Sequence, residues 1–78
     1  MKTRYKFIHF ESMATRLFPN LGWKVVNNKN GDFLGTIQWY PAWKQYAFIT
    51  VDSIVFSTGC LVDILDFIRQ LELRLLIP

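Results

Sequence analysis

Few side chains in this sequence have the types and spacing that catalysis requires. His9 is the only histidine and Cys60 the only cysteine, and neither belongs to the closely spaced ligand pairs that mark zinc sites. Cys60 lies beside apolar residues, which favours an unreactive, buried thiol. Asp63 and Asp66 are three residues apart on the polar face of an expected helix, where solvated charges are more common than an acid–base pair. We therefore expect no enzymatic activity, no metal site and no cofactor.

One run of aromatic residues has the chemistry of a binding site. Four aromatic rings and a lysine surround an expected turn, and such rings can stack on nucleic-acid bases or anchor a protein partner. The structural alternative is that these rings pack across strands in the core, as Trp39 and Tyr46 would. We expect this alternative to hold for two of the four rings and to leave Trp43 and one tyrosine exposed. The candidate binding residues are Trp39, Tyr40, Trp43, Lys44 and Tyr46.

A series of short strands must position this run. The pair Asn30-Gly31 supplies the positive φ angles of a tight hairpin turn, between strands expected at residues 23–26 and 33–40. Pro41 ends the second strand because it has no backbone N–H for a ladder. Residues 41–44 then form a turn, residues 45–51 a third strand and residues 54–56 a short fourth.

An amphipathic helix is expected after these strands, opening at Thr58-Gly59-Cys60. Its apolar residues recur at spacings of three and four, and the expected core-facing set is Leu61, Ile64, Leu65, Ile68, Leu71 and Leu75. Near the N-terminus, residues 5–10 have the composition of a strand, and residues 12–18 have that of two helical turns. The expected fold is α+β: a three- to four-stranded antiparallel sheet and a C-terminal helix, with a short N-terminal strand or helix.

Apolar side chains fall on both faces of the expected sheet. Strict alternation places Phe33, Ile37 and Trp39 on one face. It places Leu34 and Tyr40 on the other. A single helix can cover one face, so the second must be covered by residues 1–22, by a second copy of the chain or by another partner.

Length and charge narrow the class of protein. The 78 residues are enough for one domain, and 51% of them are hydrophobic. Residues 1–39 carry six basic and two acidic side chains, whereas residues 40–78 carry three basic and four acidic ones. This asymmetry points mildly to an acidic partner; the alternative is an ordinary solvated surface. No apolar run reaches the length of a membrane span, and a lone cysteine fits a reducing compartment. We expect a cytoplasmic protein without membrane contact.

Two motifs add a family resemblance. Residues 35–48 follow the pattern G-x-I-x-W-Y-x-x-W-[RK]-x-Y-x-F, and after Phe56 residues 60–68 follow C-L-x-D-I-x-x-F-I. This block, about residues 23–72, resembles a family of small uncharacterised proteins from bacteria and their phages. The resemblance implies that residues 23–78 are the sheet-plus-helix domain and residues 1–22 a variable N-terminal extension, and it implies no activity. With a helix at residues 12–18, the order α-β-β-β-α is also similar to double-stranded-RNA-binding domains.

Together these patterns favour a non-enzymatic interaction module of phage origin. Its expected partner is a host protein or a second copy of itself, bound through surplus sheet-face and turn aromatics. The alternative is a nucleic-acid-binding domain that uses a basic, aromatic sheet surface.

Overall fold

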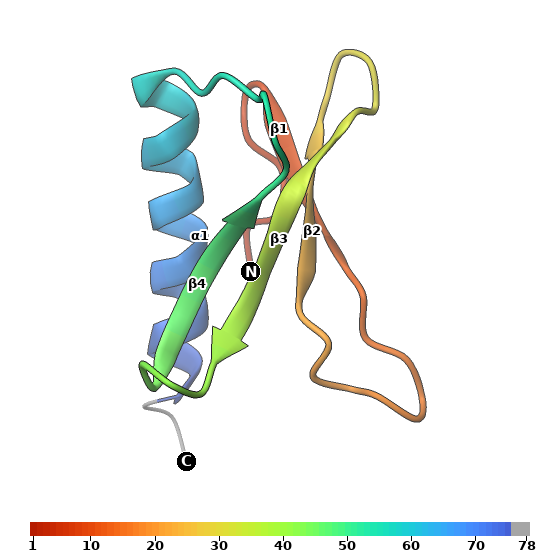
Figure 1. Ribbon diagram of the computed structural model, residues 1–78, viewed down its shortest axis with the longest axis vertical. Coiled ribbons are helices and arrows are strands. Elements are labelled where there is room, and N and C mark those ends of the chain that lie inside the picture. Colours follow the sequence, from red (N-terminus) through yellow and green to blue (C-terminus); the bar gives the residue numbers. More distant parts are fainter. Residues whose placement is uncertain (76–78) are drawn as a thin grey trace.

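A computed structural model describes residues 1–75 and shows one four-stranded antiparallel sheet with one helix packed against it (Figure 1). The strands occur in the sheet in their chain order, and each pairs with the next. The expected α+β fold, a sheet followed by one C-terminal helix, is confirmed. The elements are β1 (Ile8–Ser12), β2 (Trp23–Asn27), β3 (Phe33–Tyr40), β4 (Gln45–Thr50) and α1 (Thr58–Leu75).

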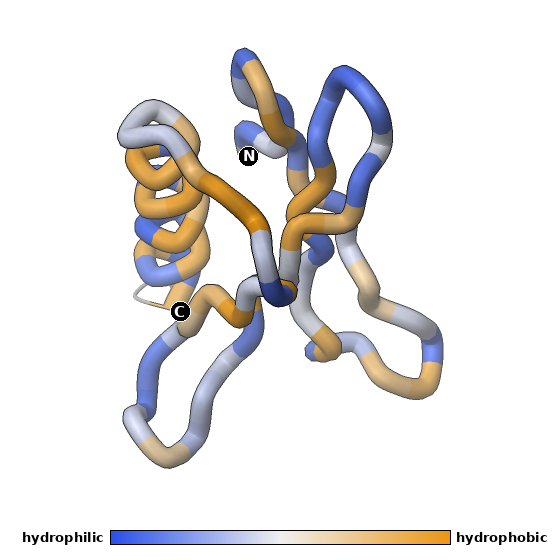
Figure 2. The backbone as a smooth tube through the Cα atoms, turned by 45° about the horizontal axis from the view of Figure 1, so that its top comes forward, coloured by the Kyte–Doolittle hydropathy of each residue, from blue (hydrophilic) through white to orange (hydrophobic). Residues whose placement is uncertain are grey.

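The hairpin between β2 and β3 forms where the sequence predicts it. Gly31 has a φ angle of 76°, a left-handed conformation that glycine adopts without steric cost. The side-chain oxygen of Asn27 accepts a hydrogen bond from the backbone N–H of Lys29 at 2.8 Å, which closes the turn locally. Figure 2 shows the hydrophilic tip of this hairpin, in keeping with a turn that projects into solvent.

The expected helix at residues 12–18 is absent, and the order α-β-β-β-α is therefore absent too. Ser12 ends strand β1 instead, and its hydroxyl accepts a hydrogen bond from the backbone N–H of Ala14 at 3.1 Å. The backbone N–H of Met13 then donates to the carbonyl of Gly22 across the base of a loop. Serine here uses its side chain to start a loop rather than to cap a helix.

The expected strand at residues 54–56 is also absent, and β1 is the fourth strand. Ser53, with a φ of 62°, turns the chain away from the sheet before it could pair again. Ile54 and Phe56 pack against the core as loop residues on the way to α1. Burial, rather than strand pairing, explains their apolar character.

Residues near the N-terminus share the sheet and the core with the rest of the chain. β1 pairs with β2 from Ile8 opposite Asn27 to Ser12 opposite Trp23. Tyr5, which precedes β1, is also buried in the core cluster. The proposed variability of residues 1–22 stays a prediction.

A β-bulge changes the expected alternation in β3. Val25 lies opposite Gly35 and Val26 opposite Phe33, so Leu34 is an extra residue in the ladder. Leu34 consequently lies in the helix-side core with Ile37, and the prediction that Phe33 rather than Leu34 shares the face of Ile37 was wrong. Gly35 has a φ of 151°, and an added Cβ would collide with the carbonyl oxygen of Ile49. The bulge and the close approach of β4 both require glycine at this position.

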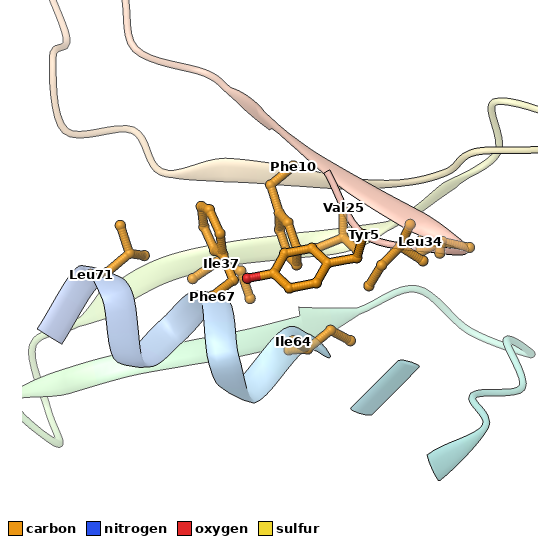
Figure 3. Packing of buried hydrophobic residues seen from close by; sticks show 9 residues of the cluster. Tyr5, Phe10, Val25, Leu34, Ile37, Ile64, Phe67 and Leu71 are labelled. Atoms are coloured by element: carbon orange, nitrogen blue, oxygen red, sulfur yellow. The ribbon is translucent and has the colours of Figure 1, made fainter. Parts of the chain in front are cut away.

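Phe67 occupies the centre of the core between α1 and the sheet (Figure 3). It is fully buried and its ring stacks on Phe10 with a centroid distance of 4.0 Å. Ile64 and Leu71 are buried on the same side of α1, whereas Leu61 and Leu65 are half exposed. The helix is thus rotated from the expected orientation, because the large Phe67 ring faces the sheet.

The sheet face opposite α1 carries a mixture of polar and apolar side chains. The register places His9, Glu11, Lys24, Thr36 and Gln38 on it together with Val26, Phe33, Tyr40, Ala47 and Ile49. Among residues 1–75, no second helix or strand lies over this face (Figure 1). The bulge places Phe33 on this face in place of Leu34, and the other β3 and β4 residues of the face lie where strict alternation predicts them. Within the same described residues, no helix is both long enough and apolar enough to cross a membrane.

Candidate functional site

A cleft of about 870 Å³ lies where the sheet, the loop of residues 13–22 and the C-terminal half of α1 meet. Its volume is in the range of clefts that hold a small molecule or the side chains of a partner. The sheet contributes aromatic rings, the helix contributes leucines and an arginine, and the loop forms the remaining wall. The lining residues are Ser12, Ala14, Pro19, Asn20, Gly22, Trp23, Trp39, Tyr46, Leu71, Arg74 and Leu75.

Cross-strand pairing fixes the aromatic floor of the cleft. Trp39 on β3 lies opposite Tyr46 on β4, and their rings meet edge to face with centroids 5.3 Å apart. Trp23 on β2 makes a similar edge contact with the core residue Phe67 at 5.1 Å. Rings held in this way lose little conformational entropy when they bind a ligand. Trp39 is still 43% exposed, so its surface remains open to a partner.

A glycine allows the loop wall to lie close against β3. Gly22 has a φ of 101°, and a Cβ at this position would collide with the carbonyl oxygen of Ile37. The Met13 N–H to Gly22 C=O hydrogen bond of 2.9 Å closes the loop at its base. Within the loop, the Thr15 hydroxyl accepts from the N–H of Phe18 at 2.9 Å. Hydrogen bonds within the loop therefore define its conformation.

The described lining of the cleft includes one cationic side chain. Arg74, in the last turn of α1, lines the cleft. Arg16 and Lys44 are outside this lining, although the loop of residues 13–22 and the β3–β4 turn that contain them lie at the same end of the molecule as the end of α1 (Figure 1). No carboxylate, histidine or cysteine is among the cleft-lining residues in the part of the chain that the structure describes. This arrangement can bind an apolar or aromatic group beside an anion, and its lining offers no acid–base pair.

The structure divides the five candidate binding residues into two groups. Trp39 and Tyr46 are cross-strand neighbours, as the sequence predicts, and line the cleft. Tyr40 and Trp43 contact each other outside it, with ring centroids 4.6 Å apart. Trp43 is 64% exposed, and Lys44 follows it with a left-handed φ of 52° in the turn.

Sequence patterns missed more than half of the cleft. The sequence predicts Trp23 as a strand residue, Leu71, Arg74 and Leu75 as helix residues and the loop as part of an extension, and it assigns none of them to a site. The sequence signal that could have located the loop wall is Pro19-Asn20-Leu21-Gly22, which predicts a tight turn directly before Trp23. Arg74 reaches this turn only because α1 packs against the sheet.

His9 lies away from the cleft and has structural partners. Its Nδ1 lies 2.6 Å from the Asn28 side-chain oxygen, and its Nε2 lies 2.7 Å from Glu11 Oε2. The Asn28 amide nitrogen donates to the carbonyl of Tyr5, so the asparagine oxygen faces the imidazole. The hydrogen bond from His9 holds the pKa of Glu11 below its ordinary value, and Lys24 lowers it further.

The other residues considered as candidates for chemistry form no metal-binding cluster in the described part of the chain. Residues 1–75 contain no group of three or more histidine, cysteine, aspartate or glutamate side chains that could hold a metal ion. Cys60 is half buried and packs against the core from the first turn of α1.

Comparisons with protein-family models, with curated proteins and with solved structures found no match to this chain. The resemblance to the small bacterial and phage family therefore stays a prediction. The geometry of the cleft carries the functional argument alone.

Proposed function

We propose that this chain is a non-enzymatic protein-binding module. Its cleft binds an exposed protein segment that presents a bulky apolar side chain next to a carboxylate. The observation that carries the proposal is Trp39, which is 43% exposed on the floor of a cleft whose rim includes Arg74. Buried tryptophan and arginine contacts dominate the affinity of many protein interfaces.

The two parts of the cleft match the two parts of such a segment. The rings of Trp23, Trp39 and Tyr46 and the side chain of Leu71 provide an apolar floor. The guanidinium of Arg74 provides paired N–H donors for a carboxylate. Anions at the rim also benefit from the excess of basic residues in the N-terminal half of the chain.

The proposed partner is a host protein, and the proposed setting is the cytoplasm. The family resemblance supports the first, and the single half-buried cysteine supports the second because a reducing compartment keeps such a thiol free. Both follow from the sequence patterns rather than from the cleft.

A random peptide library displayed on phage tests the proposal directly. Selection on the wild-type protein should enrich peptides that contain an aromatic or large aliphatic residue next to Asp or Glu. Trp39→Ala and Arg74→Glu should each weaken binding of a selected synthetic peptide by about tenfold or more. Trp43→Ala is the matched control, because Trp43 is exposed outside the cleft, and it should leave binding within about twofold.

Two results would contradict the proposal. The first is selected peptides that bind Trp39→Ala and wild type equally well, with both proteins folded by circular dichroism. The second is binding of mixed-sequence single-stranded DNA that depends on Trp39 and weakens steeply with added salt. The second result would establish the nucleic-acid-binding alternative at the same cleft.

A further inference from the structure

The two edge strands of the sheet, β1 and β4, differ in whether other parts of the chain hydrogen-bond to them. At the β1 edge, the N–H of Phe10 donates to the carbonyl of Thr3 at 2.8 Å, and the N–H of Tyr5 donates to the carbonyl of Ile8 at 2.9 Å. The segment before β1 therefore bonds to the outward C=O of Ile8 and to the outward N–H of Phe10. This segment covers part of the β1 edge and hinders its pairing with another chain.

The β4 edge is open. The N–H of Val51 donates to the carbonyl of Leu34, and the alternation of an antiparallel ladder then turns the backbone groups of Tyr46, Phe48 and Thr50 away from β3. No other backbone segment within residues 1–75 hydrogen-bonds to these outward groups.

None of the usual protective devices is present on β4. The strand sequence is Gln-Tyr-Ala-Phe-Ile-Thr, with no charged residue and no proline. Proteins usually block such an edge with lysine, proline, a bulge or a covering segment. A six-residue, uncharged and open edge is consequently a pairing surface.

An apolar flank of α1 extends this surface. Asp66 and Gln70 bond to Tyr5 on the β1 side of the helix, and Ile64 faces the sheet. Helical geometry places Leu61 and Leu65 on the opposite flank, toward β4, where they are 50% and 45% exposed. The open backbone groups and this flank lie on the same side of the molecule.

We propose that a second copy of this chain pairs with the first along β4, antiparallel, with Phe48 of both copies at the twofold axis. This register joins Tyr46 of one copy to Thr50 of the other, so all three outward residues of β4 find partners. A shift in either direction would lose at least one of these three pairs.

Charge complementarity selects the same register. Lys44 lies just before β4 and Asp52 just after it, each four residues from Phe48. In the antiparallel pair, Lys44 of each copy therefore meets Asp52 of the other, once at each end of the interface. The twofold axis is perpendicular to the sheet, so both α1 helices lie on one face of a continuous eight-stranded sheet, with their Leu61 and Leu65 flanks toward the axis.

The pairing does not depend on the proposed peptide binding. Lys44 and Asp52 lie outside the cleft lining, and the peptide assay uses Trp39 and Arg74. Either proposal can fail while the other holds.

Charge reversal tests the register. Light scattering coupled to size exclusion, from about 1 µM to about 1 mM protein, should show a concentration-dependent dimer. Lys44→Glu and Asp52→Lys should each raise the dimer Kd by about tenfold, because each creates two like-charge contacts per dimer. The double variant Lys44→Glu with Asp52→Lys should return the Kd to within about threefold of wild type.

A proline variant tests the edge itself. Thr50→Pro removes an outward N–H without breaking the β3 ladder and should abolish the dimer, whereas Thr50→Ala controls for loss of the hydroxyl and should dimerise. Circular dichroism shows that each variant is folded. A wild-type monomer throughout the concentration range would overturn the proposal, as would a dimer that neither charge reversal nor Thr50→Pro weakens.

Discussion

The hydroxyl of Tyr5 donates a hydrogen bond of 2.5 Å to the carboxylate of Asp66 and accepts one of 2.9 Å from the Gln70 amide. These contacts join the segment before β1 to the middle of α1, across more than sixty residues of chain. Burial, followed by the hydrogen bond to Asp66, raises the pKa of Tyr5 to about 12. The Tyr5 side chain thereby links the stability of the core to alkaline pH.

Replacing Tyr5 with phenylalanine should lower the free energy of unfolding by about 1–2 kcal/mol at neutral pH, since the ring stays and the two hydrogen bonds are lost. The pKa of Tyr5 is higher in the folded than in the unfolded chain, so its stabilisation is complete below pH 10 and is lost as pH rises through about 12. Urea unfolding at several pH values should show a smaller alkaline loss for Tyr5→Phe than for wild type. Tyr40→Phe, at an exposed ring, should behave like wild type.

Gly35→Ala should destabilise the protein by about 2 kcal/mol or more, because the new Cβ meets the Ile49 carbonyl and the backbone keeps a left-handed φ. Thermal unfolding measures the change. Gly59→Ala is the control: its Cβ would meet only the Ser57 hydroxyl at 3.8 Å, and alanine favours the helix. Equal melting temperatures for Gly35→Ala and wild type would contradict the bulge geometry.

Phe67→Ala should cost about 3–5 kcal/mol, since it removes a fully buried ring that stacks on Phe10 and contacts Trp23. A domain of this size has little stability to spare, so the variant should be largely unfolded at 37 °C. Leu73→Ala, at a position that is 61% exposed on the same helix, should change stability by less than about 1 kcal/mol. Near-ultraviolet circular dichroism distinguishes the two outcomes.

Glu11 should titrate below its ordinary pKa of 4.5, because His9 donates to its carboxylate and Lys24 lies nearby. A carboxyl group with a lowered folded-state pKa stabilises the fold above its unfolded-state pKa, and that effect is lost as pH falls through the folded-state pKa. Carbon-detected NMR titration measures the midpoint. His9→Ala should move the midpoint back up toward 4.5; an unchanged midpoint would show that the His9 bond does not set it.

Local sequence signals predicted the strand-rich centre of the fold well. The Asn30-Gly31 turn, the stop at Pro41 and the spacing of leucines after Thr58 correspond to the β2–β3 hairpin, the end of β3 and helix α1. Each signal acts through the backbone of a few neighbouring residues, which is why single-sequence patterns capture it.

The remaining features depend on contacts between distant residues. The extra residue Leu34 follows from the way β2 meets β3, and the rotation of α1 follows from the space that Phe67 fills. Of the candidate site, Trp39 and Tyr46 were found because strand pairing is local, whereas Arg74 joins them only after α1 docks. Tertiary packing, which local patterns do not encode, completes the cleft.

The bond between Tyr5 and Asp66 also constrains the order of events during protein synthesis. β1 and Tyr5 leave the ribosome early, yet the side chains that bury and bond them belong to α1, which is made after all four strands. Ile8, Phe10 and Val25 can therefore be covered by α1 only after all four strands have been made. Chaperones that shield nascent apolar chains have their longest opportunity to bind this protein during that interval.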